Sequence, residues 1–181
     1  MKNAIIRLML LSTSFCFFSC DNTQTSSGLI APTEKQSLEK KPEEISITAL
    51  LCAGTDPSTT SGTWYSEGLF EDVGEASSQA TGHGSPNGPN RMVDGELVLV
   101  SPVGTITIHF QERILLPAPG FPVLAEAEGT WVILRGTGGY NNLHGEGSIK
   151  IQLRVDVEGD CGGPPNLKIP AELRGTAHFA P

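Results

Sequence analysis

Hydrophobic and polar residues alternate along most of the chain after residue 44. The clearest run is residues 149–158, which read IKIQLRVDVE, and residues 105–110 (TITIHF) repeat the pattern on a shorter scale. A period of two places every apolar side chain of a strand on one face, whereas a helix would scatter these side chains around its circumference. The pattern therefore predicts β-strands with one buried face and one face in water.

Turn residues separate these runs. Residues 101–104 (SPVG) have proline and glycine where a tight turn needs them, which predicts a hairpin between residues 96–100 and 105–112. The other predicted strands are residues 44–52, 62–71, 74–82, 123–135, 145–158 and 171–179. Eight short strands without a helical pattern predict an all-β domain, namely an antiparallel eight-stranded barrel with a sandwich as the alternative. Two stretches rich in Gly and Pro, residues 81–91 and 116–122, are predicted to be loops, and the second would present Phe121.

The first nineteen residues have the character of a bacterial signal peptide. Lys2 and Arg7 precede an apolar core of about eleven residues, which is too short to span a bilayer but suits an exported leader. The segment ends in Ser19 and Cys20, an arrangement that resembles the lipobox, in which a small residue precedes a cysteine that becomes lipidated. This resemblance implies a lipoprotein with acyl chains such as palmitate on Cys20, and the alternative is a signal peptide with an incidental cysteine.

Residues 20–43 are rich in Ser, Thr, Lys, Glu and Pro and contain no aromatic residue. This composition cannot bury enough apolar surface to offset chain entropy, so we expect a disordered tether between the leader (1–19) and one domain (44–181). We therefore expect the protein at the bacterial cell envelope, held to a membrane by its lipid anchor, while the choice of membrane stays open.

The negative charge of the chain excludes two classes of binding partner. The formal net charge is −8, and removal of Lys2 and Arg7 with the leader leaves 10 basic and 20 acidic residues, or −10. Such a surface repels phosphate groups, so nucleic acid is not an expected partner and neither is a direct contact with anionic lipid.

The four cysteines separate by position. Cys16 lies in the leader and Cys20 is the expected lipidation site, which leaves Cys52 and Cys161 as a pair in an oxidising compartment. A disulfide between them is the expected state, because no CxxC spacing or neighbouring base indicates a redox-active or metal-bound thiol. It would close a loop of about 110 residues and stabilise the fold by up to about 4–5 kcal/mol.

A glycine-rich segment at residues 136–147, GTGGYNNLHGEG, resembles the strand–turn–strand corner of the allene oxide cyclase-like and dirigent-like small β-barrels. The resemblance implies a barrel in which Tyr140 and Leu143 point inward. Known members include a cyclase acting on fatty-acid epoxides and proteins that steer the coupling of phenol radicals. No catalytic motif of these members can be placed on residues of this sequence, so we assign no catalytic residue from it.

Few residues suggest chemistry. The four histidines lack metal-binding spacing, so no metal and no cofactor is predicted. His144 and Glu146 would share one face of a strand, either as an acid–base pair or as a solvent-facing pair. Trp64, Trp131 and Tyr140 would either fill the barrel interior or line a pocket for a small ligand. These five residues are the candidate ligand-binding set.

Three functions remain open after this reading. The preferred one is a non-enzymatic, membrane-tethered barrel that binds a small apolar ligand or another envelope component. The first alternative is an enzyme of the cyclase or isomerase kind acting on a hydrophobic substrate inside the barrel, which a buried titratable group at the floor of a pocket would favour. The second is a structural or interaction module with a packed interior. Association of identical copies through the outer sheet faces is also open.

Overall fold

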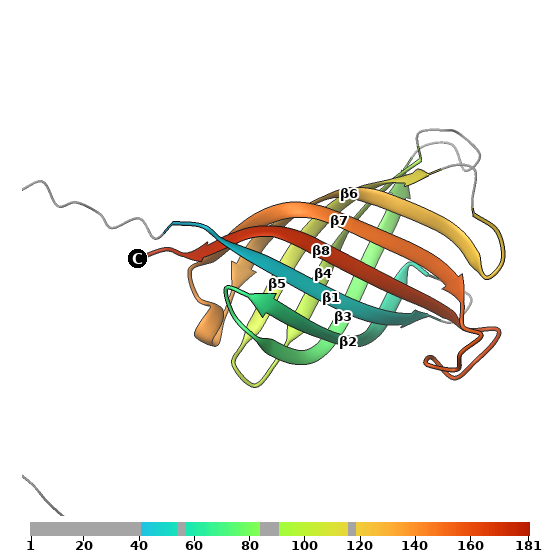
Figure 1. Ribbon diagram of the computed structural model, residues 1–181, viewed down its shortest axis with the longest axis horizontal. Helices are drawn as coiled ribbons and strands as arrows, with labels where there is room; N and C mark the ends of the chain where they lie inside the picture. Colours follow the sequence, from blue (N-terminus) through green and yellow to red (C-terminus); the bar gives the residue numbers. More distant parts are fainter. Residues whose placement is uncertain (1–40, 54–56, 84–90, 116–118) are drawn as a thin grey trace, which may run out of the picture. The chain divides into compact units, whose positions relative to one another are not determined.

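A computed structural model of the protein describes residues 41–53, 57–83, 91–115 and 119–181 (Figure 1). The predicted leader, Cys20 and residues 21–40 of the predicted tether lie outside this part of the chain. Most of the predicted loop at residues 81–91 and part of the loop at residues 116–122 lie outside it as well.

The domain is an all-β closed barrel, as the alternation predicts. Each strand pairs antiparallel with the next along the chain. The strands are β1 (Glu43–Ala53), β2 (Thr59–Gly68), β3 (Asp72–His83), β4 (Met92–Val100), β5 (Thr105–Leu115), β6 (Val123–Gly136), β7 (Leu143–Val155) and β8 (Leu167–Phe179), with one short 3₁₀ turn, η1 (Gly138–Tyr140), before β7.

The pairing of β8 with β1 closes the sheet. Ile47 of β1 lies opposite Ser66 of β2 on one side and opposite Leu173 of β8 on the other. Closure gives every strand two neighbours, so no strand edge is left to pair with another molecule. The barrel rather than the sandwich is therefore the architecture of this sequence.

Apolar side chains fill the interior and polar side chains cover the outside. In β1, every second residue from Ile45 to Ala53 is buried, and the deepest core positions, such as Ile47, Leu99, Ile106 and Leu173, are 0% exposed. The intervening residues of the strands are mostly charged or hydroxylated. Among the described residues, no helix is long and apolar enough to cross a bilayer.

Some strand limits differ from those predicted. Strand β2 ends at Gly68 rather than continuing to residue 71, because Gly68 adopts a left-handed backbone (φ 102°) that turns the chain. Its apolar successors Leu69 and Phe70 pack against the core from the turn, which is why they resemble strand residues in the sequence. Strands β4 and β8 begin earlier than predicted, at Met92 and Leu167, because ladder pairing extends past the alternating runs.

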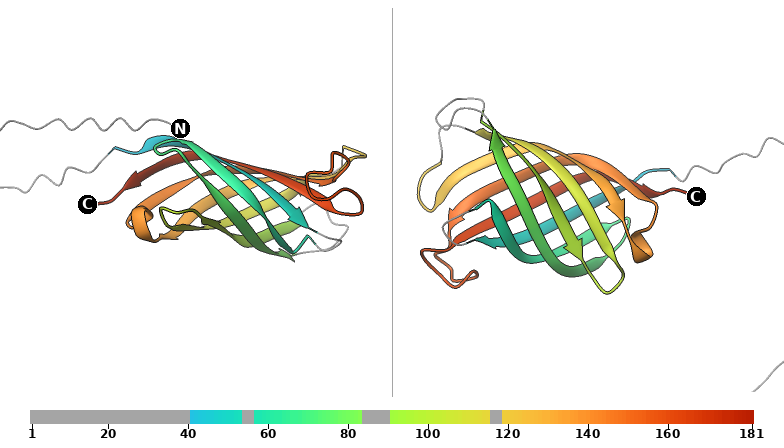
Figure 2. Two further views of the ribbon diagram at one scale, coloured as in Figure 1. Left: turned by 90° about the horizontal axis from the view of Figure 1, so that it is seen from below. Right: turned by 180° about the vertical axis from the view of Figure 1, so that it is seen from behind.

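The two ends of the barrel differ (Figure 2). We call the end with the short connections β2–β3, β4–β5 and β6–β7 the terminal end, because β1 begins there and β8 finishes there. We call the other the loop end, because the longer connections β1–β2, β3–β4, β5–β6 and β7–β8 gather there. The predicted hairpin between β4 and β5 lies at the terminal end, where Ser101 donates its N–H to the Gly104 carbonyl at 2.9 Å.

A polar network fixes the terminal end. Tyr140, at the end of η1, is 2% exposed, and its hydroxyl donates to the Asp72 carboxylate. Ser101 donates to the same Asp72 oxygen at 2.6 Å, and the Phe70 ring lies 5.2 Å from the Tyr140 ring. Burial, together with the bond to Asp72, raises the pKa of Tyr140 to about 12. Burial opposes ionisation of Asp72, but hydrogen bonds from Ser101, Tyr140 and its neighbour's N–H outweigh it and lower the pKa of that carboxyl.

Candidate ligand-binding cavity

A cavity of about 390 Å³ opens at the loop end of the barrel. This volume is within the range of small-molecule sites. Its walls come from all eight strands and are mainly apolar; the apolar lining residues include Leu51, Ala80, Val93, Phe110, Ile114, Ala127, Ile151, Leu153 and Ile169. The cavity is therefore an apolar lumen inside the barrel rather than a groove on its surface.

The distribution of large and small side chains explains why the space lies at this end. Trp64, Trp131 and Phe110 are each no more than 3% exposed and fill the middle of the barrel. Nearer the loop end, inward positions are small, as at Ser78 and Ala80. Side chains of this size cannot fill the section of an eight-stranded barrel, so an opening remains.

An ionisable residue, Glu112, lines this cavity. It continues the inward row of β5 after Ile106, Ile108 and Phe110, and it is only 2% exposed. Gly129 lies opposite it on β6, where a Cβ would stand 1.9 Å from the Gln111 carbonyl oxygen, so only glycine permits this close approach of the two strands. Burial raises the pKa of Glu112 to about 7.

Two buried oxygens in this cavity have no hydrogen-bond partner within the part of the chain that is described. One is Oε1 of Glu112 and the other is Oγ1 of Thr60, which is 5% exposed. Thr60 comes from β2 and Glu112 from β5, three strands apart in a ring of eight, so they stand on nearly opposite sides of the interior. Buried polar atoms are seldom left unpaired, and here both line a space that a ligand can enter.

Because the pKa of Glu112 is raised in the folded state, we expect the free energy of unfolding to depend on pH. Below pH 4.5 the carboxyl is protonated in both states, whereas above pH 7 the folded state must hold a buried charge that the unfolded chain solvates. The free energy of unfolding of the wild-type chain relative to Glu112→Gln should therefore fall by about 3 kcal/mol as the pH rises from 4.5 to 8. Urea titrations of both chains across this range measure the difference, and parallel pH profiles would contradict the assignment.

Charged residues stand at the mouth of the cavity. Arg91 is exposed at the start of β4, and Glu126 of β6 accepts a hydrogen bond from the Gln152 amide at 2.8 Å. Phe121, in the β5–β6 connection, is 77% exposed, as expected for a loop that presents it. Glu126 thus has a hydrogen-bond partner, whereas Oε1 of Glu112, deeper in the cavity, has none.

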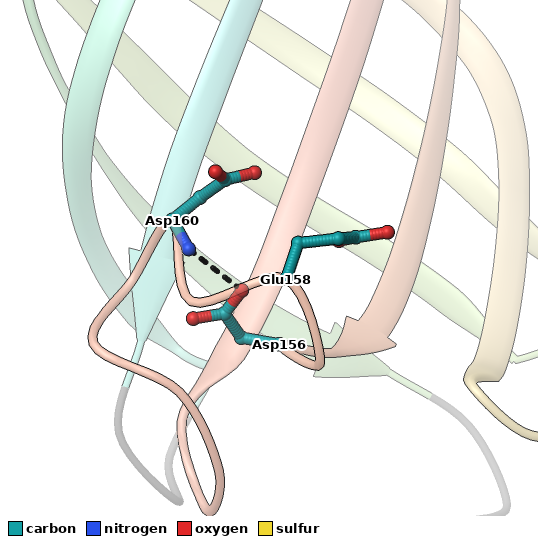
Figure 3. Close-up of side chains that lie close together, drawn as sticks. All are labelled: Asp156, Glu158 and Asp160. Atoms are coloured by element: carbon teal, nitrogen blue, oxygen red, sulfur yellow. Dashed lines mark hydrogen bonds between the residues drawn. The ribbon is translucent and has the colours of Figure 1, made fainter.

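The β7–β8 connection is organised by one buried carboxylate, Asp156, which is 0% exposed (Figure 3). Oδ1 accepts the N–H groups of Gly159 and Asp160, both at 3.1 Å, and Oδ2 accepts those of Cys161 at 2.7 Å and Gly163 at 2.8 Å. Burial opposes the ionisation of Asp156, but these four donors outweigh it and lower its pKa. The Asp156 carboxylate therefore fixes the conformation of the loop, whose backbone N–H groups surround it.

The same loop brings three carboxylates together. Oxygens of Asp156, Glu158 and Asp160 lie within 4.8 Å of one another, a spacing that a metal ion could use. However, both Asp156 oxygens are occupied by backbone donors, and the Lys168 ammonium pairs with Glu158 at 3.0 Å and also with Asp160. The hydrogen bonds that the Lys168 ammonium donates to Asp160 and Glu158 raise its pKa. The cluster is thus satisfied by the protein's own groups.

Cys52 and Cys161 form a disulfide, as the cysteine positions predict. The bond joins β1 to the β7–β8 loop across 109 residues of sequence. It lies at the loop end, so it fixes one side of the cavity mouth to the strand that contributes Leu51 to the wall.

The five ligand-binding candidates selected from the sequence lie outside the lining of the loop-end cavity. Trp64 is buried and donates from Nε1 to the Val100 carbonyl at 3.2 Å, and Trp131 donates to the Ser148 and Arg174 carbonyls. Tyr140 belongs to the network at the terminal end. These three aromatic residues fill and brace the interior, and none of them contributes to the cavity wall.

His144 and Glu146 are exposed on the outer face of β7. His144 stacks on His178 of β8, with ring centroids 5.7 Å apart, and Glu146 borders a shallow depression on the outside of the barrel. The structure therefore places this pair in solvent and separates it from the loop-end cavity. No hydrogen bond between the two residues is found among the described contacts.

Sequence reasoning did not select Glu112, although a signal for it exists. In residues 105–112, Ile106, Ile108, Phe110 and Glu112 all have even numbers, so the alternation that buries the first three also turns Glu112 inward. A carboxylic acid in an inward row is uncommon unless it has a partner or a task.

Comparison of the chain with protein families, with curated proteins and with solved structures finds no match.

Proposed function

We propose that this domain binds a small, mainly apolar molecule in the loop-end cavity, and that the chain acts as a lipid-anchored binding protein of a bacterial cell envelope. The observation behind the binding role is the cavity of about 390 Å³, which has apolar walls and a buried polar floor with unpaired oxygens. The envelope location follows from the signal-peptide pattern and from the lipobox-like Ser19 and Cys20.

A bound molecule should be detectable directly. The chain from Asp21 onward, exported to an oxidising compartment, is weighed by native mass spectrometry and again after denaturation without reductant. A reproducible excess in the native spectrum supports the proposal and gives the mass of the ligand. Recovery of the bare chain from cells and from mixtures with alkyl compounds would instead favour a structural module that acts through its outer surface.

Filling the cavity should abolish binding. In Ala80→Phe, the new ring projects from β3 into the cavity, and we expect the native mass excess to disappear, with at least a ten-fold loss of affinity for the captured molecule. Thr81→Phe is the matched control, because Thr81 is the next residue of the same strand and is exposed on the outer face. Equal occupancy in both variants would place the ligand outside the barrel.

A second candidate function has one specific observation in its favour. A carboxyl whose pKa is raised to about 7 can give up and regain a proton near neutral pH, which suits a general acid–base group. Combined with apolar walls, this supports an isomerase- or cyclase-type enzyme in which Glu112 moves a proton within a hydrophobic substrate. The resemblance to the allene oxide cyclase-like and dirigent-like barrels is in keeping with this reading.

The captured molecule itself distinguishes the two functions. After it is identified, an excess of it is incubated with the protein and analysed by chromatography. Recovery of the unchanged compound supports a binding protein. Conversion to an isomer of the same mass, absent in Glu112→Gln, supports the enzyme.

A further inference from the structure

The polar groups of the cavity indicate the chemistry of its ligand. Glu112 and Thr60 each present a buried oxygen without a partner, and neither the described Lys nor the described Arg side chains form an ion pair with Glu112. Above pH 7 the Glu112 carboxyl is ionised and only accepts hydrogen bonds, so its missing partner under these conditions is a donor. On the basis of the proposed binding function, we propose that the ligand of this cavity carries an amine, which binds the Glu112 carboxylate and is attached to an apolar body.

An ammonium group matches the Glu112 carboxylate better than other polar groups do. It offers up to three N–H donors to the carboxylate, whereas an alcohol has a single donor. Its charge also compensates the carboxylate, which removes the cost of an unpaired buried charge. A ligand with a carboxylate would place a second negative charge beside ionised Glu112. Its binding would therefore require that either the ligand carboxyl or the Glu112 carboxyl is protonated.

The other charged residues near the cavity leave Glu112 free to bind the cationic group of a ligand inside the barrel. Besides Glu112, the charged residues that line the cavity within the described part of the chain are Arg91 and Glu126, both at the mouth. Glu126 is engaged by Gln152, and Arg91 is exposed to solvent, so neither neutralises the buried acid. The chain as a whole has a net charge of −8, which attracts cations towards the protein.

The apolar body would occupy the wall region. Val93, Ile114, Ile151 and Leu153 surround the space, and about 390 Å³ accommodates an alkyl chain or a small ring system next to the amine. The ligand class is therefore a small amphipathic amine, oriented with its nitrogen towards Glu112 of β5.

Three alkyl probes of equal length test the proposal. Isothermal titration of the chain from Asp21 onward at pH 8 compares n-octylamine, 1-octanol and octanoate. We expect n-octylamine to bind at least ten-fold more tightly than 1-octanol, and octanoate to bind most weakly. In Glu112→Gln, the preference for the amine should disappear, while the affinity for 1-octanol changes less than three-fold. Glu126→Gln is the matched control, because it removes a carboxylate at the mouth and should keep the preference.

A measurement on the wild-type chain gives a second, independent readout. At pH 5 Glu112 is protonated and n-octylamine is still an ammonium ion, so the preference for the amine over the alcohol should shrink towards unity. Near pH 7, binding of the amine should release about half a proton, seen as a dependence of the heat on the ionisation enthalpy of the buffer. This test does not depend on the folding of any variant.

The outcomes separate this inference from the binding function beneath it. Equal binding of n-octylamine and 1-octanol at both pH values, unchanged in Glu112→Gln, would overturn the amine while leaving the cavity as a binding site. Failure of all three probes, together with a bare chain in native mass spectrometry, would overturn the binding function itself. Persistence of the amine preference in Glu112→Gln would also overturn the assignment to Glu112.

Discussion

Replacement of both Cys52 and Cys161 with serine is expected to lower the free energy of unfolding by up to about 4–5 kcal/mol. The disulfide joins residues 109 positions apart, so its loss releases nearly the whole barrel sequence in the unfolded chain. Chain entropy of the unfolded state gives this upper value. Urea unfolding of the oxidised wild type and of the double variant at one pH measures the effect.

Two comparisons sharpen this test. Wild-type protein unfolded in the presence of dithiothreitol should show the same loss as the double serine variant, because both lack the same link. The cavity should survive, since Asp156 still binds the four N–H groups of its loop. Identical urea midpoints for oxidised and reduced protein would show that the bond does not restrict the unfolded chain.

Truncation of Trp131 to alanine should destabilise the barrel by about 3–5 kcal/mol, the usual cost of removing a buried tryptophan. Trp131 is 2% exposed, and its Nε1 donates to the Ser148 carbonyl at 3.0 Å and the Arg174 carbonyl at 3.3 Å. The indole spans β6, β7 and β8, because Gly147 and Gly175 lie next to it in the ladders and have no side chain to obstruct it. Chemical denaturation followed by far-ultraviolet circular dichroism gives the free energy.

Matched variants separate the size of the ring from its N–H group. Trp131→Phe keeps an aromatic ring and loses the donor, so a smaller loss of about 1–3 kcal/mol is expected. Val132→Ala changes the next residue, which is 39% exposed on the outer face, and should stay within about 0.5 kcal/mol of the wild type. A loss in Val132→Ala as large as that in Trp131→Ala would contradict the inward assignment.

The fold could be predicted from the sequence to a large extent. Alternation at residues 105–110 and 149–155 predicts the strands and their inner faces, and the turn at residues 101–104 predicts one hairpin. The prediction is wrong at residues 156–158, because β7 ends at Val155, after which Asp156 is 0% exposed and Val157 is 48% exposed. The pairing of Cys52 with Cys161 follows from the positions of the other two cysteines. The ends of strands are less predictable from sequence. Leu69 and Phe70, for example, lie in the turn after β2, but they are apolar like the residues of a strand.

The site could not be predicted in the same way. Alternation shows that Trp64 and Glu112 both point inward, but it does not tell which of them lies in a filled layer and which borders a space. That distinction depends on how small residues from separate strands, such as Ser78 and Ala127, align at one end of the closed ring. This alignment is a property of the register between strands, which no single strand encodes. For the same reason, Tyr140 could be expected inside but not assigned to the terminal end.

The opposite placement of chain entry and cavity mouth has a consequence for ligand traffic. Strand β1 begins at the terminal end, and the cavity opens at the loop end, so the chain enters the barrel at the end away from the mouth. A ligand of the proposed kind would enter and leave at the loop end, past the β7–β8 loop that the disulfide holds, and a protein that takes over this ligand would have to contact the same end.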